Sequence, residues 1–406
     1  MARSFIVVTA ATALAVSFAS DAIALKKYGP GVTDAEIKIG QTVPYSGPLS
    51  SLGIFGRVEA AYLRKINDSG GIDGRKITLI SVDDAFSPPK TVEQTRKLVE
   101  NDEVLAIVAS IGTPTNLAVA KYLNINNVPQ ILLLAGTPKL DDPENLPWTT
   151  TFAMSQLVET KIYADYLLKS KPDAKVAVLY QNDDLGRGNL GGFKAALGAK
   201  AATMIVKEAA YDVADPTIDS QILALKASGA DTLFHASTPR FAAQSIRKAY
   251  EIGWKVQHIL LSGISEIPTV LRPAGLDAST GAVTSIWLKL PGDPTWDDDT
   301  DMRSYRAFMK QWAPGDSAED SSAVFAYSIA QMIVEVLKNC GDDLSRENVL
   351  RQATNISDLQ LPLFIPGVKV NISPTSRVAW RQAWMARFDG TKWVFFGHSI
   401  VSPANN

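Results

Sequence analysis

Short apolar runs alternate with longer amphipathic stretches along most of this chain. The runs at 36–40, 76–83, 104–108 and 130–134 are rich in Ile, Val and Leu, and the segments between them have helical periodicity. Continuous apolar runs are typical of strands in a parallel sheet that helices cover on both faces. The alternation therefore predicts a doubly wound α/β domain.

The same alternation begins again after turn-forming residues at 141–148. Strands are predicted at 175–180, 203–207, 231–235 and 257–261, with helices between them. No close sequence repeat accompanies the second series, so only the order of elements recurs. Two α/β units in tandem predict two Rossmann-like lobes with a cleft between them.

The last part of the chain does not make a third unit. A strand is predicted at 282–287, helices at about 321–337 and 346–353, and a hairpin at 380–396 with a tight turn at Asp389-Gly390. We expect the helices to return to the first lobe and the hairpin to the second, so that several crossings form a hinge. Each predicted lobe then has two segments, 25–147 with about 290–369 for the first and 148–289 with about 370–406 for the second.

The first 24 residues have the pattern of a secretory signal peptide. Arg3 precedes an apolar run at 5–16, and small residues follow at Ala22-Ile23-Ala24. The run is too short to cross a bilayer comfortably, and the flanks argue against the alternative of a buried N-terminal helix. We expect export to a bacterial periplasm, cleavage near Ala24, and neither a lipid anchor nor direct membrane insertion.

Charge and cysteine content narrow the functions further. The chain of 406 residues has 40 Lys and Arg against 42 Asp and Glu, so no basic surface is expected to attract nucleic acid. Cys340 is the only cysteine, which excludes an intramolecular disulfide. An exported protein has no ready supply of ATP or NAD(P)H. Binding or hydrolysis is therefore favoured, and no cofactor is expected.

One motif indicates a different function. Gly186–Gly191 has the pattern G-x-G-x-x-G between a predicted strand and a helix, with Glu208 where a ribose-binding acid would stand. Five residues separate the motif from the strand, and Asp183 and Asp184 would lie beside a pyrophosphate. We interpret the motif as a glycine-rich loop that opens a helix at the lobe interface. A secreted nucleotide-dependent enzyme stays as a weak alternative.

Hydrolysis and metal binding have little support in the sequence. The three histidines are His235, His258 and His398, and none stands in a G-x-S-x-G or H-E-x-x-H pattern. We expect His235 and His258, at strand ends, to be structural. The Asp83-Asp84 pair is interpreted as solvated charge in a turn. Neither a catalytic site nor a metal site is predicted.

Small and hydroxyl-bearing residues follow two strands of the first unit. They occupy 110–116 and 135–138. Ligands of open α/β sheets bind outside the carboxyl ends of strands, where helix N-termini present free N–H groups. The two loops predict a donor-lined pocket for a carboxylate. Ordinary N-capping by Thr113 and Thr115 explains the first loop equally well.

Five short segments are similar to those of a known family. Residues 67–77, N-D-S-G-G-I-D-G-R-K-I, match a characteristic turn, and 37–40, 45–48, 128–130 and 180–186 match further parts of its pattern. Through them the chain resembles the branched-chain amino acid type of periplasmic substrate-binding proteins, which serve ABC importers. The resemblance covers nearly the whole chain after the signal. It implies the type I periplasmic binding fold and closure on a small ligand without catalysis.

The resemblance also implies which positions meet the ligand. Thr113, with Thr115 close by, falls where the family has a hydroxyl for the ligand carboxylate. Leu134 and Gly136 fall where a second loop offers its backbone carbonyl and N–H groups. The positions implied for ligand contact are Leu52, Thr113, Thr115, Leu134, Ala135, Gly136, Thr137, Asp183, Leu185, Thr238, Ser262 and Glu266.

The departures from the family concern the ligand. Amino-acid binders typically have aromatic residues where Leu52, Leu185 and Thr238 stand here. They also have a carboxylate for the ligand ammonium near Ser262, where the nearest acid of this chain is Glu266. Unless Glu266 takes that role, an ammonium would be buried without a counter-charge. The sequence therefore favours an aromatic or aliphatic acid over a branched-chain amino acid. Delivery to membrane permease subunits and ligand sensing by the same fold both stay open.

Overall fold

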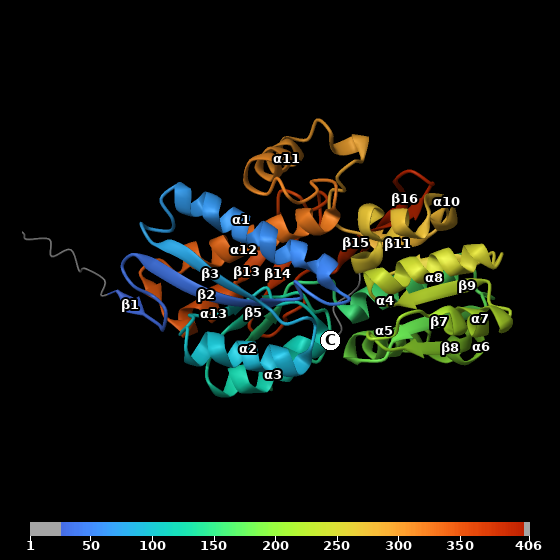
Figure 1. Ribbon diagram of the computed structural model, residues 1–406, viewed down its shortest axis with the longest axis horizontal. Coiled ribbons are helices and arrows are strands. Elements are labelled where there is room, and N and C mark those ends of the chain that lie inside the picture. Colours follow the sequence, from blue (N-terminus) through green and yellow to red (C-terminus); the bar gives the residue numbers. More distant parts are fainter. Residues whose placement is uncertain (1–25, 402–406) are drawn as a thin grey trace, which may run out of the picture.

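Two α/β lobes lie side by side, joined through the middle of the molecule (Figure 1). The structure is a computed structural model that describes residues 26–401. The predicted signal peptide lies outside these residues. Among the helices of residues 26–401, none combines the length and apolarity that a membrane crossing requires.

Lobe one is the part of the molecule around a five-stranded sheet of order β3-β2-β4-β5-β6, in which all pairings are parallel. Helices α1 and α12 pack together on one face and α2 with α3 on the other (Figure 1). Its strands are β2 (Glu36–Val43), β3 (Lys76–Asp83), β4 (Ile107–Val108), β5 (Gln130–Leu133) and β6 (Thr149–Thr151). Its helices are α1 (Ile54–Asp68), α2 (Pro88–Glu100), α3 (Thr113–Ile125), α11 (Thr300–Trp312), α12 (Ser321–Asn339) and α13 (Arg346–Ala353).

Lobe two is the part around a seven-stranded sheet of order β16-β15-β11-β10-β9-β7-β8. The five strands from β11 to β8 are parallel, and the final hairpin joins β11 antiparallel. Its strands are β7 (Val176–Gln181), β8 (Ile205–Tyr211), β9 (Thr232–Ala236), β10 (Gln257–Leu260), β11 (Val283–Ile286), β15 (Gln382–Phe388) and β16 (Trp393–Val401). Its helices are α4 (Gln156–Ser170), α5 (Asp184–Leu197), α6 (Ala201–Met204), α7 (Asp219–Ala227), α8 (Pro239–Glu251), α9 (Arg272–Ala274) and α10 (Leu276–Ser279).

The predicted doubly wound α/β class is confirmed, and short elements account for most of what the sequence missed. Two small sheets were not predicted: β1 (Lys27–Tyr28) with β12 (Asp343–Leu344), and β13 (Ile356–Leu359) with β14 (Val370–Ile372). Strands this short contain too few residues for a periodic pattern. The residue boundaries of the lobes stay a prediction.

The chain passes between the two sheets three times, after β6, after β11 and before β15. Buried aromatic rings from these passages pack together. The Trp287 ring lies 4.6 Å from Phe325 and 4.6 Å from Trp380 between centroids, and Phe152 lies 5.2 Å from Trp380. Aromatic pairs at such spacings add to the free energy gained by burial. This cluster holds the segments that connect the lobes and forms one wall of the cavity described below.

Candidate functional site

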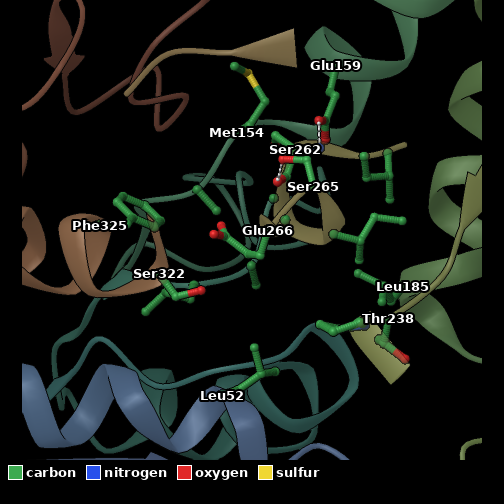
Figure 2. Close-up of a pocket in the computed structure, with 18 of the residues that line it drawn as sticks. Leu52, Met154, Glu159, Leu185, Thr238, Ser262, Ser265, Glu266, Ser322 and Phe325 are labelled. Atoms are coloured by element: carbon green, nitrogen blue, oxygen red, sulfur yellow. Dashed lines mark hydrogen bonds between the residues drawn. The ribbon is translucent and has the colours of Figure 1, made fainter. Parts of the chain in front are cut away.

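A cavity of about 230 Å³ lies between the lobes, next to the carboxyl ends of strands from both sheets (Figure 2). Most of its wall is apolar, and Phe55, Phe86, Met154, Trp287 and Phe325 contribute the largest side chains. No Lys, Arg or His is among its lining residues, all of which belong to the described part of the chain. The cavity suits a small ligand with an apolar body.

Nine of the twelve positions implied for ligand contact line this cavity. They come from both lobes, because the loops after β4 and β5 meet those after β9 and β10. The nine are Leu52, Thr113, Leu134, Ala135, Gly136, Leu185, Thr238, Ser262 and Glu266. Their contact with a ligand stays a prediction.

The other three positions, Thr115, Thr137 and Asp183, do not line the cavity and support its loops instead. Thr115 Oγ1 donates to the Ile111 carbonyl at 2.6 Å, one turn earlier. Thr137 Oγ1 accepts from Lys139 N at 3.4 Å. Asp183 caps α5, since its Oδ1 accepts from the first backbone N–H groups of that helix. Capping and turn bonds of this kind hold loops in place without touching a ligand.

Thr113 is one of five residues of the cavity wall whose buried polar atoms have no partner among the described residues, the others being Gln156, Asn189, Ser237 and Trp287. Thr113 is 1% exposed at the first position of α3, and its Oγ1 forms no hydrogen bond with any described residue. Leaving a buried hydroxyl unpaired costs about 1–3 kcal/mol. The N-terminus of α3 also carries free N–H groups and the positive end of the helix dipole. Hydroxyl and helix end together suit an anion.

The neighbouring loop allows no side chain at Gly136. A Cβ there would lie 2.0 Å from the Met154 carbonyl oxygen, because the loop after β5 runs against the passage into lobe two. The Gly136 carbonyl accepts from Gln156 N at 2.7 Å, and the Leu134 carbonyl accepts from Gly112 N at 3.2 Å. The resemblance implied that this loop offers its backbone carbonyl and N–H groups to the ligand. Here the carbonyls of Leu134 and Gly136 each already accept a backbone hydrogen bond.

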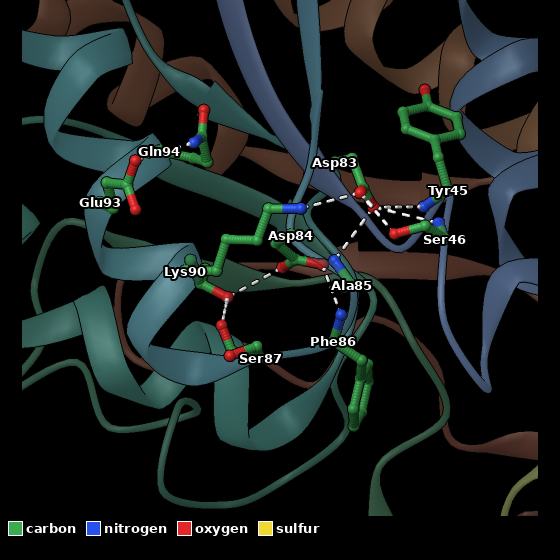
Figure 3. Close-up of polar contacts among 11 residues, drawn as sticks. Tyr45, Ser46, Asp83, Asp84, Ala85, Phe86, Ser87, Lys90, Glu93 and Gln94 are labelled. Carbon is green, nitrogen blue, oxygen red and sulfur yellow. Dashed lines mark hydrogen bonds and ion pairs between the residues drawn. The ribbon is translucent and has the colours of Figure 1, made fainter.

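The Asp83-Asp84 pair is not solvated turn charge, contrary to the expectation (Figure 3). Asp84 is fully buried and accepts from Phe86 N at 2.9 Å and from Thr91 Oγ1 at 2.9 Å. Burial is the main cause that raises the pKa of Asp84. These bonds hold Phe86 at a φ of 57°, with its ring in the cavity wall. The sequence did not reveal this role because the partners of Asp84 lie across a turn.

Asp83 organises the same corner from outside the cavity (Figure 3). Its carboxylate accepts from Tyr45 N at 2.9 Å, from Ser46 Oγ at 2.6 Å and from Lys90 Nζ at 2.8 Å. Burial raises the pKa of Asp83, but the bonds from Lys90 and Ser46 outweigh burial and lower it overall. Asp83 therefore ties the loop after β2, which leads to Leu52, to the loop that carries Phe86.

Lobe two contributes a buried glutamate that the sequence did not single out. Glu159 lies in the first turn of α4, and its Oε1 accepts from Ser262 N at 2.6 Å, Tyr163 Oη at 2.9 Å and Ser285 Oγ at 3.2 Å (Figure 2). Burial raises the pKa of Glu159, and the bonds from Ser262 counter part of that rise. Ser262 is distant from Glu159 in the sequence. The only signal for the role of Glu159 was therefore a charged residue on a largely apolar helix.

Glu266 reaches from lobe two to lobe one. It stands in the loop after β10, and its Oε2 accepts from Ser321 N at 3.0 Å and from Ser321 Oγ at 2.5 Å, at the start of α12. Burial is the main cause that raises the pKa of Glu266 to about 8, and repulsion from Asp320 adds to it. The two carboxyl groups of the cavity thus both accept hydrogen bonds from protein groups.

The glycine motif lies inside α5 rather than in a loop, which corrects our interpretation. A Cβ at Gly186 would lie 2.0 Å from the Gln181 carbonyl oxygen, and one at Gly188 would lie 2.5 Å from Gln156 Oε1. The glycines therefore let α5 pack closely on β7 and α4. Asp183 already occupies the first N–H groups of this helix, which a pyrophosphate would need.

The fold and the cavity together define a two-lobed ligand-binding protein, and comparison with known proteins places it in a family. A family model described as periplasmic binding protein matches residues 36–392. The chain belongs to the periplasmic binding protein family.

Individual relatives agree with this assignment. The Leu/Ile/Val-binding protein homolog 7 of Brucella abortus (strain 2308) is 27% identical over 250 residues, which cover 59% of this chain and 62% of that protein. The match thus spans less than two thirds of the relative's length.

Two solved structures share the type I periplasmic binding fold. A branched chain amino acid ABC transporter from Thermus thermophilus with bound valine has a TM-score of 0.81 at 17% identity, covering 91% of this chain and 98% of that one. A solute binding protein of an ABC transporter from Rhodopseudomonas palustris BisB5, in complex with 3,4-dihydroxy benzoic acid, has a TM-score of 0.75 at 22% identity, covering 90% and 97%.

Proposed function

We propose that this protein is the solute-binding component of an ABC importer and binds a small organic acid in the cavity between its lobes. The observation that carries the proposal is Thr113. Its buried, unpaired hydroxyl stands at the N-terminus of α3 and faces an apolar cavity. A ligand carboxylate would pair this hydroxyl and meet the positive end of the helix dipole.

The apolar wall supports an acid with a hydrocarbon body. Burial of such a body contributes about 25 cal/mol per Å² of apolar surface removed from water. The volume of about 230 Å³ fits an aromatic acid or a short branched aliphatic acid. The structural neighbours named above bind valine in one case and 3,4-dihydroxy benzoic acid in the other, so this fold accommodates both kinds of body.

A solute-binding component of an ABC importer would act in transport by delivering its ligand to the membrane permease. The lobes would close over the ligand by rotation about the three connecting segments, and the closed form would dock on the membrane permease subunits. The location would be the periplasm, in keeping with the family. No catalytic step is part of this proposal.

A thermal-shift screen tests the proposal. Benzoate or isocaproate should raise the Tm of the protein, because a ligand that binds only the native state stabilises it by mass action. Thr113→Val should reduce the shift, since the carboxylate loses a hydrogen bond worth about 1.5–3 kcal/mol. A Tm raised by NAD, with no response to any acid or amino acid, would overturn the proposal.

A further inference from the structure

The four aromatic residues of the cavity wall differ in what their rings contact. Phe325 pairs with Phe55 at 6.0 Å and with Trp287 at 4.6 Å between ring centroids, and all three belong to the main apolar cluster of the core. Phe86 is 8% exposed, but among the described residues it has no aromatic partner and belongs to none of the apolar clusters. The Phe86 ring is therefore buried at the cavity without contributing to the core.

The backbone that carries this ring is strained. Ala85 and Phe86 have φ angles of 50° and 57°, in the left-handed region that bulky residues rarely adopt. Such strain persists only where the surroundings hold it, and it is concentrated at functional sites. Asp83 Oδ1 accepts from Ala85 N at 3.0 Å, and the next carboxylate does the same one residue later (Figure 3). Asp84 Oδ1 accepts from Phe86 N at 2.9 Å.

Asp84 also fixes the turn to the helix that follows. It is fully buried, and its second oxygen accepts from Thr91 Oγ1 at 2.9 Å, in the first turn of α2. In the sheet, β2 lies between β3 and β4, so a side chain after β3 must cross the end of β2 to reach the loop after β4. Phe86 makes this crossing. A Cβ at Gly112 would lie 2.5 Å from Phe86 Cε2, so the ring packs on the backbone directly before Thr113.

The Phe86 ring thus lies next to the expected position of the ligand carboxylate. A carboxylate at Thr113 would bring the first atoms of the ligand body close to this ring. Aromatic rings pack favourably on one another in offset or edge-to-face arrangements. An aromatic ring attached to the carboxylate would supply the partner that Phe86 lacks among the described residues.

We propose that the ligand is an acid whose carboxylate is carried by an aromatic ring, that this ring packs on Phe86, and that Asp84 positions Phe86 for the contact. The inference rests on the proposed function, because it takes Thr113 as the carboxylate contact. It selects the aromatic acid from the two kinds of body that the cavity volume allows.

Titration calorimetry with benzoate and cyclohexanecarboxylate tests the inference, because the two acids share a six-membered ring and a carboxylate and differ in aromaticity. The saturated ring has more apolar surface, so burial alone favours cyclohexanecarboxylate. We expect benzoate to bind about 2- to 10-fold more tightly, which is the range that an aromatic pair contributes. Phe86→Leu should abolish this preference. Phe55→Leu, at a wall ring that already has a partner, is the matched control and should keep it.

Asp84 is tested through the same ratio of Kd values. Asp84→Ala removes the acceptor for Phe86 N and should reduce the preference for benzoate, whereas Asp84→Asn keeps an oxygen for that N–H group and should restore it. In the Phe86→Leu background Asp84→Ala should leave the ratio unchanged, since Asp84 acts through Phe86. Glu93→Gln, at an exposed glutamate of α2, should behave as wild type. Thr91→Val, which removes one bond to Asp84, serves instead if Asp84→Ala does not fold.

The outcomes separate this inference from the proposed function. Equal Kd values for the two acids in the wild type, or a preference for benzoate that survives in Phe86→Leu, overturn the inference and leave the proposed function standing. A wild-type ratio in a folded Asp84→Ala or Thr91→Val variant overturns the positioning role of Asp84.

If no acid binds, the proposed function fails, and the neutral rings phenol and cyclohexanol decide the role of Phe86. Tighter binding of phenol that is lost in Phe86→Leu supports the ring contact. Equal binding of the two alcohols overturns it.

Discussion

Thr113 on one side of the cavity and the two carboxyl groups on the other differ in how they are satisfied. On the side of lobe one, Thr113 has a buried hydroxyl with no partner among the described residues, at the positive end of α3. On the side of lobe two, Glu159 accepts three hydrogen bonds from protein groups, and Glu266 accepts two. The difference teaches that polarity alone does not mark a ligand contact. We expect a ligand to pair the Thr113 hydroxyl, whereas the hydrogen bonds of Glu159 and Glu266 connect segments of the wall.

The largest effect is expected where a charge is added on the side of lobe one. Thr113→Asp would place a carboxylate next to the ligand carboxylate. Two like charges at about 4 Å cost about 4 kcal/mol at an effective dielectric constant near 20, so the Kd should rise by about 1,000-fold. Calorimetry with benzoate or isocaproate measures this. Thr113→Ser, which keeps the hydroxyl, is the matched control, and equal binding by both variants would place the carboxylate elsewhere.

The next effect concerns the pH dependence of stability, which we expect to depend on two buried histidines of lobe two. His235 and His258 lie buried on β9 and β10 with Nε2 of the first 2.9 Å from Nδ1 of the second. Burial lowers the pKa of His258 to about 4, and burial with the charge of His258 lowers that of His235. Stability is then full above the ordinary value of 6.5 and is lost as the pH falls toward 4.

The free energy of unfolding should decrease by about 3 kcal/mol over that window, from the shift of His258 alone. Urea unfolding at pH 7 and at pH 4.5 measures the change. His258→Gln should make the curve flatter in the same window. A wild-type protein equally stable at both pH values would show that these imidazoles are not buried in their neutral form.

A smaller effect is expected at Glu159 of lobe two, whose carboxyl group already accepts hydrogen bonds from protein groups. Glu159→Gln keeps the size of the side chain but weakens the bonds from Ser262 and Tyr163, and the free energy of unfolding should fall by about 1–2 kcal/mol. The Kd for the acids should change little. If binding were lost while stability was kept, Glu159 would be a ligand contact and the contrast between the two sides would be wrong.

The smallest effect is expected at the surface of the cleft. Lys139 of lobe one and Asp184 of lobe two form an exposed ion pair between the lobes. Exposed pairs contribute about 0–1 kcal/mol, so Lys139→Ala should weaken binding by less than about fivefold at low salt and hardly at all at high salt. A larger loss would mean that this pair, rather than the buried bond of Glu266, holds the lobes together.

The sequence predicted the long elements well, because continuous apolar strands and the helices between them leave a clear pattern. It missed α11, whose start lies in the acidic segment 297–301 and looks like a loop. The loop that holds Thr113 was predicted by the rule that ligands bind at the carboxyl ends of strands, and the resemblance to the family singled out Thr113 itself. Glu159 and the link from Glu266 to Ser321 were not found, because their partners are 103 and 55 residues away. Such contacts depend on how the lobes meet, and local patterns carry no information on that.

The most direct test of the account compares three ligands that share a hydrocarbon body. Isocaproate has the carboxylate alone, isoamylamine the ammonium alone, and leucine both. Titration calorimetry of the three at about pH 6.5 shows which charged group the cavity recognises. We predict binding of isocaproate, weaker binding of leucine and none of isoamylamine. Tighter binding of leucine than of isocaproate would contradict the account, since it would mean that a carboxylate of lobe two serves as the counter-charge for an ammonium group.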